Sequence, residues 1–203
     1  MDKKEAIKIV QEHGYDLSKL PIHFKKDKEI VIEAVKQQGY ALTFADQSLK
    51  KNKEIVLEAL RQDGLALEYA DDSLKKDREI VLEAVINNGL ALQYADDSLK
   101  KDREIVLEAV KEDIMVLDYA DDSLKKDKDF TLKAEKEFDL ATKNSILNFV
   151  KEDGLALENL TDRWTKDKEI CIEAVKQNTL ALKYVNESLR NDPDILAIIN
   201  KKK

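Results

Sequence analysis

Histidine and cysteine are the side chains that most often bind metals or act as nucleophiles, and this sequence contains two histidines and one cysteine. A zinc site needs several such ligands at short spacing, but no cysteine lies near His13 or His23 in the sequence. Cys171 stands where Val81 and Val106 stand in similar segments. A buried small side chain is therefore the prediction for Cys171, and a nucleophile is the alternative.

Motifs for catalysis are also missing from the sequence. It has no Gly-rich phosphate loop, nucleophile elbow, HExxH pair or paired-cysteine motif. An enzyme with an unrecognised active site would need titratable groups that converge in a pocket. The sequence therefore predicts a protein that is not an enzyme and that has no catalytic, cofactor-binding or metal-binding residues.

Aromatic residues return at a fixed spacing, which could serve to stack nucleic-acid bases. The residues are Phe44, Tyr69, Tyr94, Tyr119 and Tyr184. Because Ala and Leu flank each of them, we expect them to lie in a core between repeats, with the phenol hydroxyls at its edge. Trp164 replaces the leucine seen at Leu74, Leu99 and Leu124, so packing is its first interpretation and an anchor for a partner is the second.

Charged residues form two further ladders. The acidic pairs are Asp71/Asp72, Asp96/Asp97 and Asp121/Asp122, and the lysine pairs are Lys75/Lys76, Lys100/Lys101 and Lys125/Lys126. The acidic pairs lack the spacing of a calcium loop. A solvated edge of mixed charge is the main interpretation, and a stripe that binds a partner is the alternative.

The elements that position these residues come from a repeat. The phrase DKEIVIEAV at Asp27 returns at Asn52, Asp77 and Asp102, each 25 residues after the last. Less regular copies start near Asp2, Asp127, Thr142, Asp167 and Asp192. We number each repeat from this first residue as position 1. Periodicity at this length is typical of solenoids, so residues 1–203 are predicted to form a single all-α superhelical repeat domain, an α-solenoid of helical hairpins.

One repeat is short. The copy that starts at Asp127 lacks positions 16 to 25, which elsewhere read like LEYADDSLKK. Neither Gly nor Pro interrupts the stretch from Lys128 to Glu152. This stretch is predicted to form one long helix or a kinked pair of helices.

Within a complete repeat, one helix and a second, shorter segment are expected. Ile80, Val81, Ala84 and Val85 share a helix face, and Leu82 widens it into a broad buried stripe. Asp77 is a suitable N-cap, and Gly89 suits the left-handed position that follows a helix. The segment LALQYADDSLKK could form a strand, as in leucine-rich repeats, but its composition favours a short helix or a 3₁₀ turn.

These phrases, DKEIVLEAV followed by GLALEYADDSLKK-like segments, resemble a bacterial and protist repeat family known as domain of unknown function four-one-one-six. The resemblance covers almost the whole chain. It implies an α-helical repeat used for interactions, often attached to other domains, and it transfers no catalytic residues. Ile114 and Thr179 depart from the pattern, because the other complete repeats have glycine there.

Composition limits the partners and the location. The net charge of −7 repels a phosphate backbone, which disfavours nucleic acid. No apolar run is long enough for a signal peptide or a membrane span. The predicted location is the cytoplasm, with export by another route as the alternative.

Differences between similar repeats indicate where a partner could bind. The first helices end in Lys36-Gln37-Gln38, Arg61-Gln62-Asp63, Ile86-Asn87-Asn88 and Lys111-Glu112-Asp113, and the second segments offer Thr43, Glu68, Gln93 and Asp118. We expect a scaffold that binds a protein or peptide through these positions, with Trp164 as a further contact. Surface drift would explain the same variation. The alternative functions are a helical repeat that binds nucleic acid and a non-catalytic module of a bacterial effector or toxin.

Overall fold

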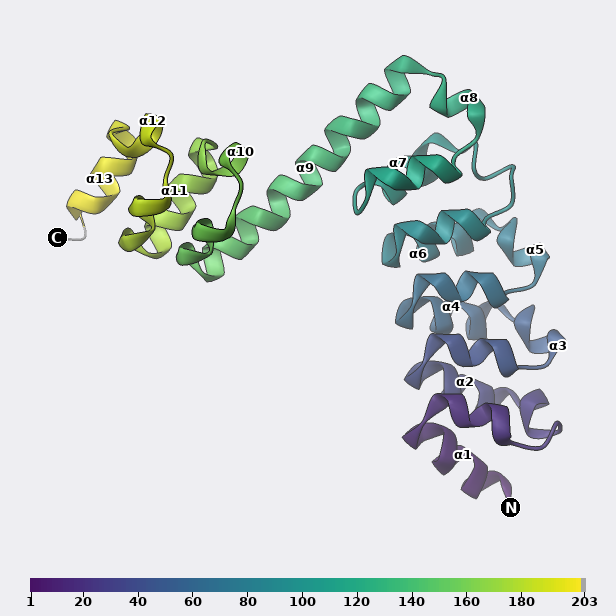
Figure 1. Ribbon diagram of the computed structural model, residues 1–203. Helices are drawn as coiled ribbons and strands as arrows, with labels where there is room; N and C mark the ends of the chain where they lie inside the picture. Colours follow the sequence, from purple (N-terminus) through teal and green to yellow (C-terminus); the bar gives the residue numbers. More distant parts are fainter. Residues whose placement is uncertain (202–203) are drawn as a thin grey trace. The chain divides into compact units, whose positions relative to one another are not determined.

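A computed structural model describes residues 1–201 of the protein, and these residues contain helices and no strand. The α-helices longer than one turn are α1 (Lys3–Glu12), α2 (Lys28–Gln37), α4 (Lys53–Gln62), α6 (Arg78–Asn87), α7 (Arg103–Val110), α9 (Lys128–Glu152), α11 (Lys168–Gln177) and α13 (Pro193–Lys201). Figure 1 shows their order along the chain.

Each complete repeat adds a 3₁₀ helix after its α-helix. These 3₁₀ helices are η1 (Gly14–Lys19), η3 (Gly39–Phe44), η4 (Gly64–Tyr69), η5 (Gly89–Tyr94), η6 (Ile114–Tyr119), η7 (Gly154–Asn159) and η8 (Thr179–Tyr184). Short turns close most repeats: η2 (Phe24–Lys26), α3 (Gln47–Lys50), α5 (Asp72–Lys75), α8 (Asp122–Lys125), α10 (Asp162–Thr165) and α12 (Glu187–Arg190). The preference for a helical second segment over a strand is confirmed.

The ends of α6 show how a repeat is delimited. The Asp77 carboxylate accepts hydrogen bonds from the backbone N–H groups of Glu79 and Ile80, so it is the predicted N-cap. The helix stops at Asn88, whose backbone is extended, with φ −153° and ψ 110°. Gly89 has a negative φ, like every glycine of the chain, so the prediction of a left-handed position is wrong. The chain needs no reversal there because it enters the 3₁₀ helix directly.

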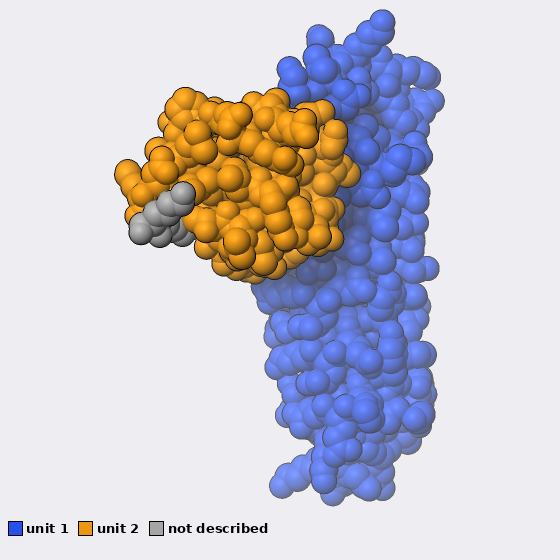
Figure 2. Space-filling model, turned by 60° about the vertical axis from the view of Figure 1, so that its left-hand side comes forward, with its two compact units in different colours: residues 1–138 blue, residues 139–203 orange. Residues whose placement is uncertain are grey.

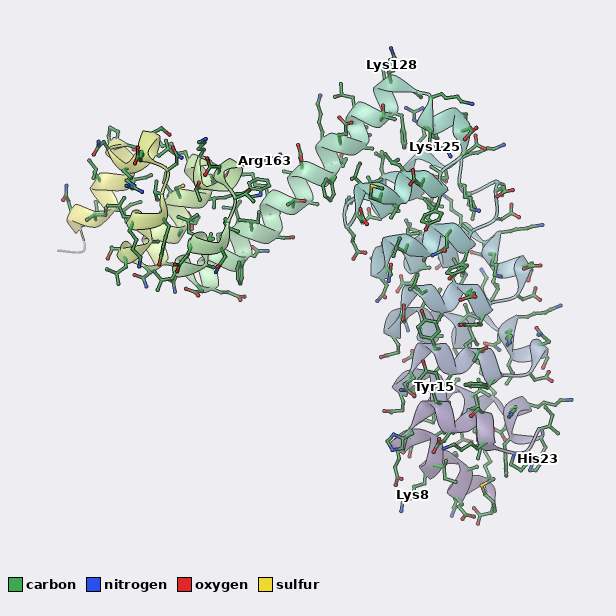
Figure 3. The ribbon with its side chains drawn as sticks, in the orientation of Figure 1. Lys8, Tyr15, His23, Lys125, Lys128 and Arg163 are labelled. Atoms are coloured by element: carbon green, nitrogen blue, oxygen red, sulfur yellow. The ribbon has the colours of Figure 1, made fainter. Side chains whose placement is uncertain are left out.

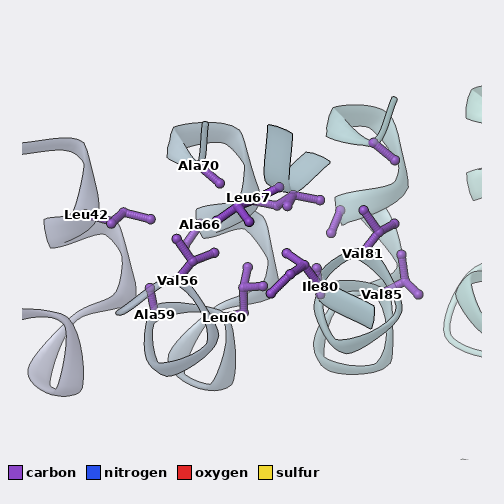
Figure 4. Close-up of a cluster of buried hydrophobic side chains, with 14 of the residues drawn as sticks. Leu42, Val56, Ala59, Leu60, Ala66, Leu67, Ala70, Ile80, Val81 and Val85 are labelled. Carbon is purple, nitrogen blue, oxygen red and sulfur yellow. The ribbon is translucent and has the colours of Figure 1, made fainter. Parts of the chain in front are cut away.

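The repeats stack in two layers within residues 1–138. From α1 to α7 the neighbouring α-helices pack side by side, and η1, η3, η4 and η5 each pack on the α-helix of their own repeat and on that of the next. Figure 4 shows Val56 and Leu60 of α4, Leu67 of η4 and Ile80 of α6 meeting between the layers. Leu82, which the sequence placed in the buried stripe, is only partly buried and packs against the edge of this core. Its position faces outward between helices, so that expectation was too strong.

Helix α9 is one continuous helix over the stretch that the sequence predicted, because the short repeat has no segment to interrupt it. The chain divides within α9 into two compact units, unit 1 with residues 1–138 and unit 2 with residues 139–203 (Figure 2). The sequence predicted a single domain, and the two units share this helix. That residues 1–203 fold as a single domain stays a prediction.

Unit 2 has its own core around α11, which packs against η7, η8 and α13. Cys171 is completely buried there, so the prediction of a small buried side chain is confirmed. Its thiol lies 3.1 Å from the carbonyl oxygen of Thr165, to which it donates. Burial raises the pKa of this thiol to about 11, which keeps it protonated near neutral pH.

Candidate functional site

Four variable positions lie on consecutive 3₁₀ helices of unit 1. Thr43, Glu68, Gln93 and Asp118 occupy position 17 of their repeats, on η3, η4, η5 and η6. These helices are neighbours in sequence order, so the four residues form one row. Glu68 and Asp118 are exposed, whereas Thr43 and Gln93 are partly buried. The structure therefore brings together four of the five residues that the sequence proposed for partner binding.

A second row runs beside the first. A 3₁₀ helix has about 3.0 residues per turn, so positions 14 and 17 lie on the same edge while positions 15 and 16 turn inward. Ala66, Leu67, Ala91 and Leu92 accordingly are completely buried. Position 14 holds Tyr40, Leu65, Leu90 and Met115, and Met115 is 63% exposed. We call these two rows together the 3₁₀ face. Its polar row is position 17, with Thr43, Glu68, Gln93 and Asp118, and its apolar row is position 14.

The second row was not predicted from the sequence, because apolar residues that recur in a repeat are expected to lie in the core. The signal was present: position 14 changes between Tyr, Leu and Met while positions 15 and 16 stay small or aliphatic. The 3₁₀ face thus combines an apolar row with a polar row whose residues differ from repeat to repeat.

Glu68 of the polar row lies close to two tyrosine side chains, Tyr69 and Tyr94. Burial raises the pKa of Tyr69 and of Tyr94, and the nearby charge of Glu68 and hydrogen bonds with it add to the effect on both. In unit 2 the same arrangement appears as a hydrogen bond of 2.6 Å from the Tyr184 hydroxyl to the Glu158 carboxylate. The aromatic residues Phe44, Tyr69, Tyr94 and Tyr184 are therefore partly buried, as predicted, whereas Tyr119 is exposed. The hydroxyls of Tyr69, Tyr94 and Tyr184 lie close to the carboxylate of Glu68 or Glu158.

Lysines fix the backbone beneath the polar row. The Lys50 ammonium donates to the carbonyl oxygen of Thr43 at 2.9 Å, and Lys125 donates to that of Asp118 at 3.4 Å. Desolvation lowers the pKa of Lys50, which fits its position against the 3₁₀ helix. At Thr43 and Asp118, these hydrogen bonds hold the backbone without involving the side chain at position 17.

The acidic and lysine ladders pair with each other along the edge formed by the short helices. Asp71 accepts hydrogen bonds from both the backbone N–H and the hydroxyl of Ser73, and Lys51 of the preceding repeat lies 3.7 Å away. The expected edge of mixed charge is confirmed, and its use as a binding stripe stays a prediction.

Helix ends were expected to be free for a partner, but several have structural contacts. The Asn87 side chain accepts a hydrogen bond from the backbone N–H of Gly64 at 2.8 Å and donates to the Arg61 carbonyl oxygen at 3.1 Å. Glu112 accepts from the N–H of Gly89 in the same way. The idea that these positions vary because they have no packing role is therefore wrong for Asn87 and Glu112.

The remaining candidate residues lie elsewhere. Trp164, on α10 of unit 2, packs against the second core, and the guanidinium carbon of Arg163, which is labelled in Figure 3, lies 4.5 Å from the Trp164 ring centroid. His23 lies against Phe24, with 4.1 Å between ring centroids. Among residues 1–201, no group of three or more His, Cys, Asp or Glu side chains is arranged to hold a metal ion.

The family model described as Domain of unknown function (DUF4116) matches the chain five times, over residues 2–50, 52–100, 102–138, 143–190 and 167–201. The chain belongs to this family. The first two DUF4116 matches each span two repeats, and the third stops at residue 138, where unit 1 ends. Neither the search of curated proteins nor that of solved structures found a match. In the described part of the DUF4116 chain, no helix is long and apolar enough to cross a membrane.

Proposed function

We propose that this chain is a non-enzymatic scaffold that binds a protein or peptide along the 3₁₀ face of unit 1. The observation that carries the proposal is the pairing of two rows on a fixed backbone. One row is apolar and partly exposed, and the other is polar and different in every repeat. Repeat proteins commonly bind partners along such a continuous face, with affinity from apolar contacts and specificity from polar ones.

Charge favours a polypeptide with basic groups as the partner. Glu68 and Asp118 are exposed acidic residues of the polar row, and the chain as a whole carries a net charge of −7. Such a surface attracts basic segments and repels phosphates. The partner is expected to use apolar side chains against Leu90 and Met115 and lysine or arginine against Glu68.

Affinity capture from a lysate of the native cell, with a matched control, tests this proposal. The test variant carries Glu68→Lys, Gln93→Lys and Asp118→Lys on the 3₁₀ face. The control variant carries Asp72→Lys, Asp97→Lys and Gln47→Lys on the short-helix edge, where these side chains are exposed, and it changes the net charge equally. Circular dichroism checks that both variants remain folded.

The expected result is a protein retained by the wild type and the control but lost by the test variant. Equal loss in both variants would show that net charge alone governs binding. Equal retention by both would show that the 3₁₀ face is not the binding surface, and capture of nucleic acid in place of protein would overturn the proposal.

A further inference from the structure

Consecutive repeats of unit 1 are joined by one recurring pair of polar contacts. The backbone N–H at position 20 donates to the carbonyl oxygen at position 24 of the preceding repeat, as from Asp96 to Lys75 and from Asp121 to Lys100, both at 3.0 Å. The carboxylate of the same aspartate lies 3.8 Å from the lysine at position 25 of the preceding repeat, Lys76 or Lys101. Each repeat thus offers a carbonyl oxygen and an ammonium group to the next.

A recurring aromatic contact accompanies this pair. The ring at position 18 packs on the residue at position 14 of the preceding repeat, with centroids 6.3 Å apart for Tyr15 and Phe44 and 5.6 Å apart for Tyr40 and Tyr69. Where position 17 of the preceding repeat is acidic, the hydroxyl at position 18 reaches its carboxylate, as from Tyr94 to Glu68 and from Tyr184 to Glu158. The four repeats of unit 1 that start at Asp27, Asn52, Asp77 and Asp102 therefore each place a Phe-Ala-Asp or Tyr-Ala-Asp segment, positions 18 to 20, on the preceding repeat.

The short repeat breaks this series at one place. It supplies the first turns of α9, in which Phe130 and Ala134 are completely buried, but it lacks the positions that would carry the tyrosine and aspartate. Met115 is 63% exposed and Tyr119 is 39% exposed. The Lys126 side chain is 78% exposed and turns back to Asp122 of its own repeat, whereas Lys101 meets the next repeat. Figure 3 labels Lys125 and Lys128 at this end of unit 1.

We propose that this vacant half-repeat site, formed by Met115, Asp118, Lys125 and Lys126, binds a Tyr-x-Asp segment of a partner polypeptide. The tyrosine ring packs on the Met115 thioether, and its hydroxyl donates to the Asp118 carboxylate. The aspartate pairs with Lys126, and its backbone N–H donates to the Lys125 carbonyl oxygen. The bound segment continues the stack of 3₁₀ helices by the backbone and lysine contacts that join the earlier repeats, with the hydroxyl contact that joins Tyr94 to Glu68.

This inference rests on the proposed function, since it names a partner segment for the last rung of the 3₁₀ face. A second copy of the chain fits the site less well. Its η7 segment has Asn159 and Thr161 at the positions of the tyrosine and the aspartate. The corresponding groups of η8 are already used, because Tyr184 donates to Glu158 and the N–H of Asn186 donates to the Thr165 carbonyl oxygen.

The chain offers a direct probe of the site, because it contains only two methionines, Met1 and Met115. The full-length chain, labelled with ¹³C in the methionine methyl groups, is titrated with a synthetic peptide of the consensus half-repeat, Gly64–Lys76, and followed by NMR. A ring current from the peptide tyrosine is expected to move the Met115 methyl signal upfield in a saturable way. The Met1 signal, from a side chain that is also exposed, serves as the internal control.

A charge exchange tests the geometry of the complex. Lys126→Glu in the chain is expected to weaken binding about tenfold, and Asp71→Lys in the peptide is expected to restore it in that variant alone. Tyr69→Ala in the peptide is expected to remove the upfield shift. The matched control is Leu180→Glu in unit 2. Leu180 occupies position 14, as Met115 does, but its repeat has Lys183 at position 17 in place of an acidic residue, so this substitution is expected to leave peptide binding unchanged.

Several outcomes would overturn the inference. One is a Met115 signal that does not move or that moves together with Met1. Another is a peptide affinity that does not change with Lys126→Glu in the chain or with Asp71→Lys in the peptide. A Met115 shift that depends on chain concentration without peptide would assign the site to a second copy. If Glu68→Lys with Gln93→Lys abolishes capture of the native partner while the peptide still binds, the two proposals concern separable surfaces. If capture depends on the 3₁₀ face but the peptide does not bind, only this inference fails.

Discussion

The carbonyl oxygen of Ala84 lies directly against the Cα atom of Gly64. A Cβ atom on Gly64 would come within 3.0 Å of this oxygen, which is closer than real Cβ atoms approach. The same relationship joins Gly39 to Ala59 and Gly89 to Ala109. All five glycines of the chain occupy position 13, and each faces the alanine at position 8 of the next repeat. This contact lets the 3₁₀ helix of one repeat approach the α-helix of the next.

Gly64→Ala is therefore expected to destabilise the protein by about 1–3 kcal/mol, since the added methyl group must push two backbones apart. Thr179→Ala, at the same repeat position before the incomplete last repeat, is the matched control and is expected to have little effect. Urea unfolding followed by circular dichroism measures both. Equal stability of Gly64→Ala and the wild type would show that the stack is not closely packed at this point.

Core packing gives a second prediction. Ile80 is completely buried between α4, η4 and α6, so Ile80→Ala is expected to cost about 2–5 kcal/mol through lost burial and a residual cavity. Leu82→Ala is expected to cost clearly less, because Leu82 is only partly buried. Gln93→Ala removes a side chain whose amide nitrogen donates to the carbonyl oxygen of Leu90 in the same 3₁₀ helix, and it is expected to cost least. An order other than Ile80, Leu82, Gln93 in the unfolding free energies would contradict the assigned faces.

A third prediction concerns the side chain that joins two repeats. Asn87→Leu keeps the size of the residue but leaves the N–H of Gly64 and the carbonyl oxygen of Arg61 without their partner. The expected cost is about 1–3 kcal/mol, because Gly64 is buried. Ile86→Ala, one residue earlier and 54% exposed, is the control and is expected to change stability little. If both substitutions have the same effect in thermal unfolding, Asn87 has no bridging role.

Much of the fold could be predicted from the sequence, because its signals were local. Asp77 shows a helix start through its residue type and neighbours alone. The absence of Gly and Pro between Lys128 and Glu152 predicted either one long helix or a kinked pair, and the structure has the single helix α9. The role of Gly89 could not be derived in this way. A glycine after a helix suits either a left-handed backbone or a close approach, and only the position of Ala109 decides between them.

The candidate site was harder to predict for a related reason. The variation at Asn87 and Glu112 was interpreted as a sign that these side chains have no structural contacts. Both side chains in fact supply an oxygen that accepts a hydrogen bond from a backbone N–H of the preceding repeat. Met115 was not predicted to be exposed, because its exposure depends on a segment that the next repeat lacks. The row at position 17 was recognised correctly as neighbouring residues, since equal spacing in a stack places equivalent positions side by side.

Acid is expected to weaken the protein through a ladder of ion pairs between repeats. A hydrogen bond from Lys53 holds the pKa of Asp77 below its usual value, and Arg103 and Lys168 do the same for Asp127 and Asp192. Because these pKa values are lower in the folded state, the stabilisation is complete above the unfolded pKa of about 4 and is lost as the pH falls through the folded values. Unfolding free energies from urea titrations are expected to be level between about pH 7 and 5 and to fall below about pH 4.

Lys53→Met provides the control for this dependence, since it removes the partner of Asp77 and should reduce the loss on acidification. Each pair is partly exposed, so the effect of one substitution is small and is screened by salt. A wild-type stability that stays level down to about pH 3 would contradict the prediction.

Cys171 gives the last prediction, because its reactivity reports on the core of unit 2. The thiol is completely buried and its pKa is raised to about 11, so at pH 8 it is almost entirely protonated and shielded from reagents. A disulfide reagent that releases a coloured thiolate is expected to react with it only when unit 2 opens, and urea is expected to accelerate the reaction. The control is Ile86→Cys in a Cys171→Val background, in which valine matches Val81 and Val106 and the new thiol is exposed. This thiol is expected to react at least on the order of a hundredfold faster in native buffer. Similar rates for the two thiols would show that the core around α11 opens readily, which would leave Trp164 on a surface far less fixed than its packing indicates.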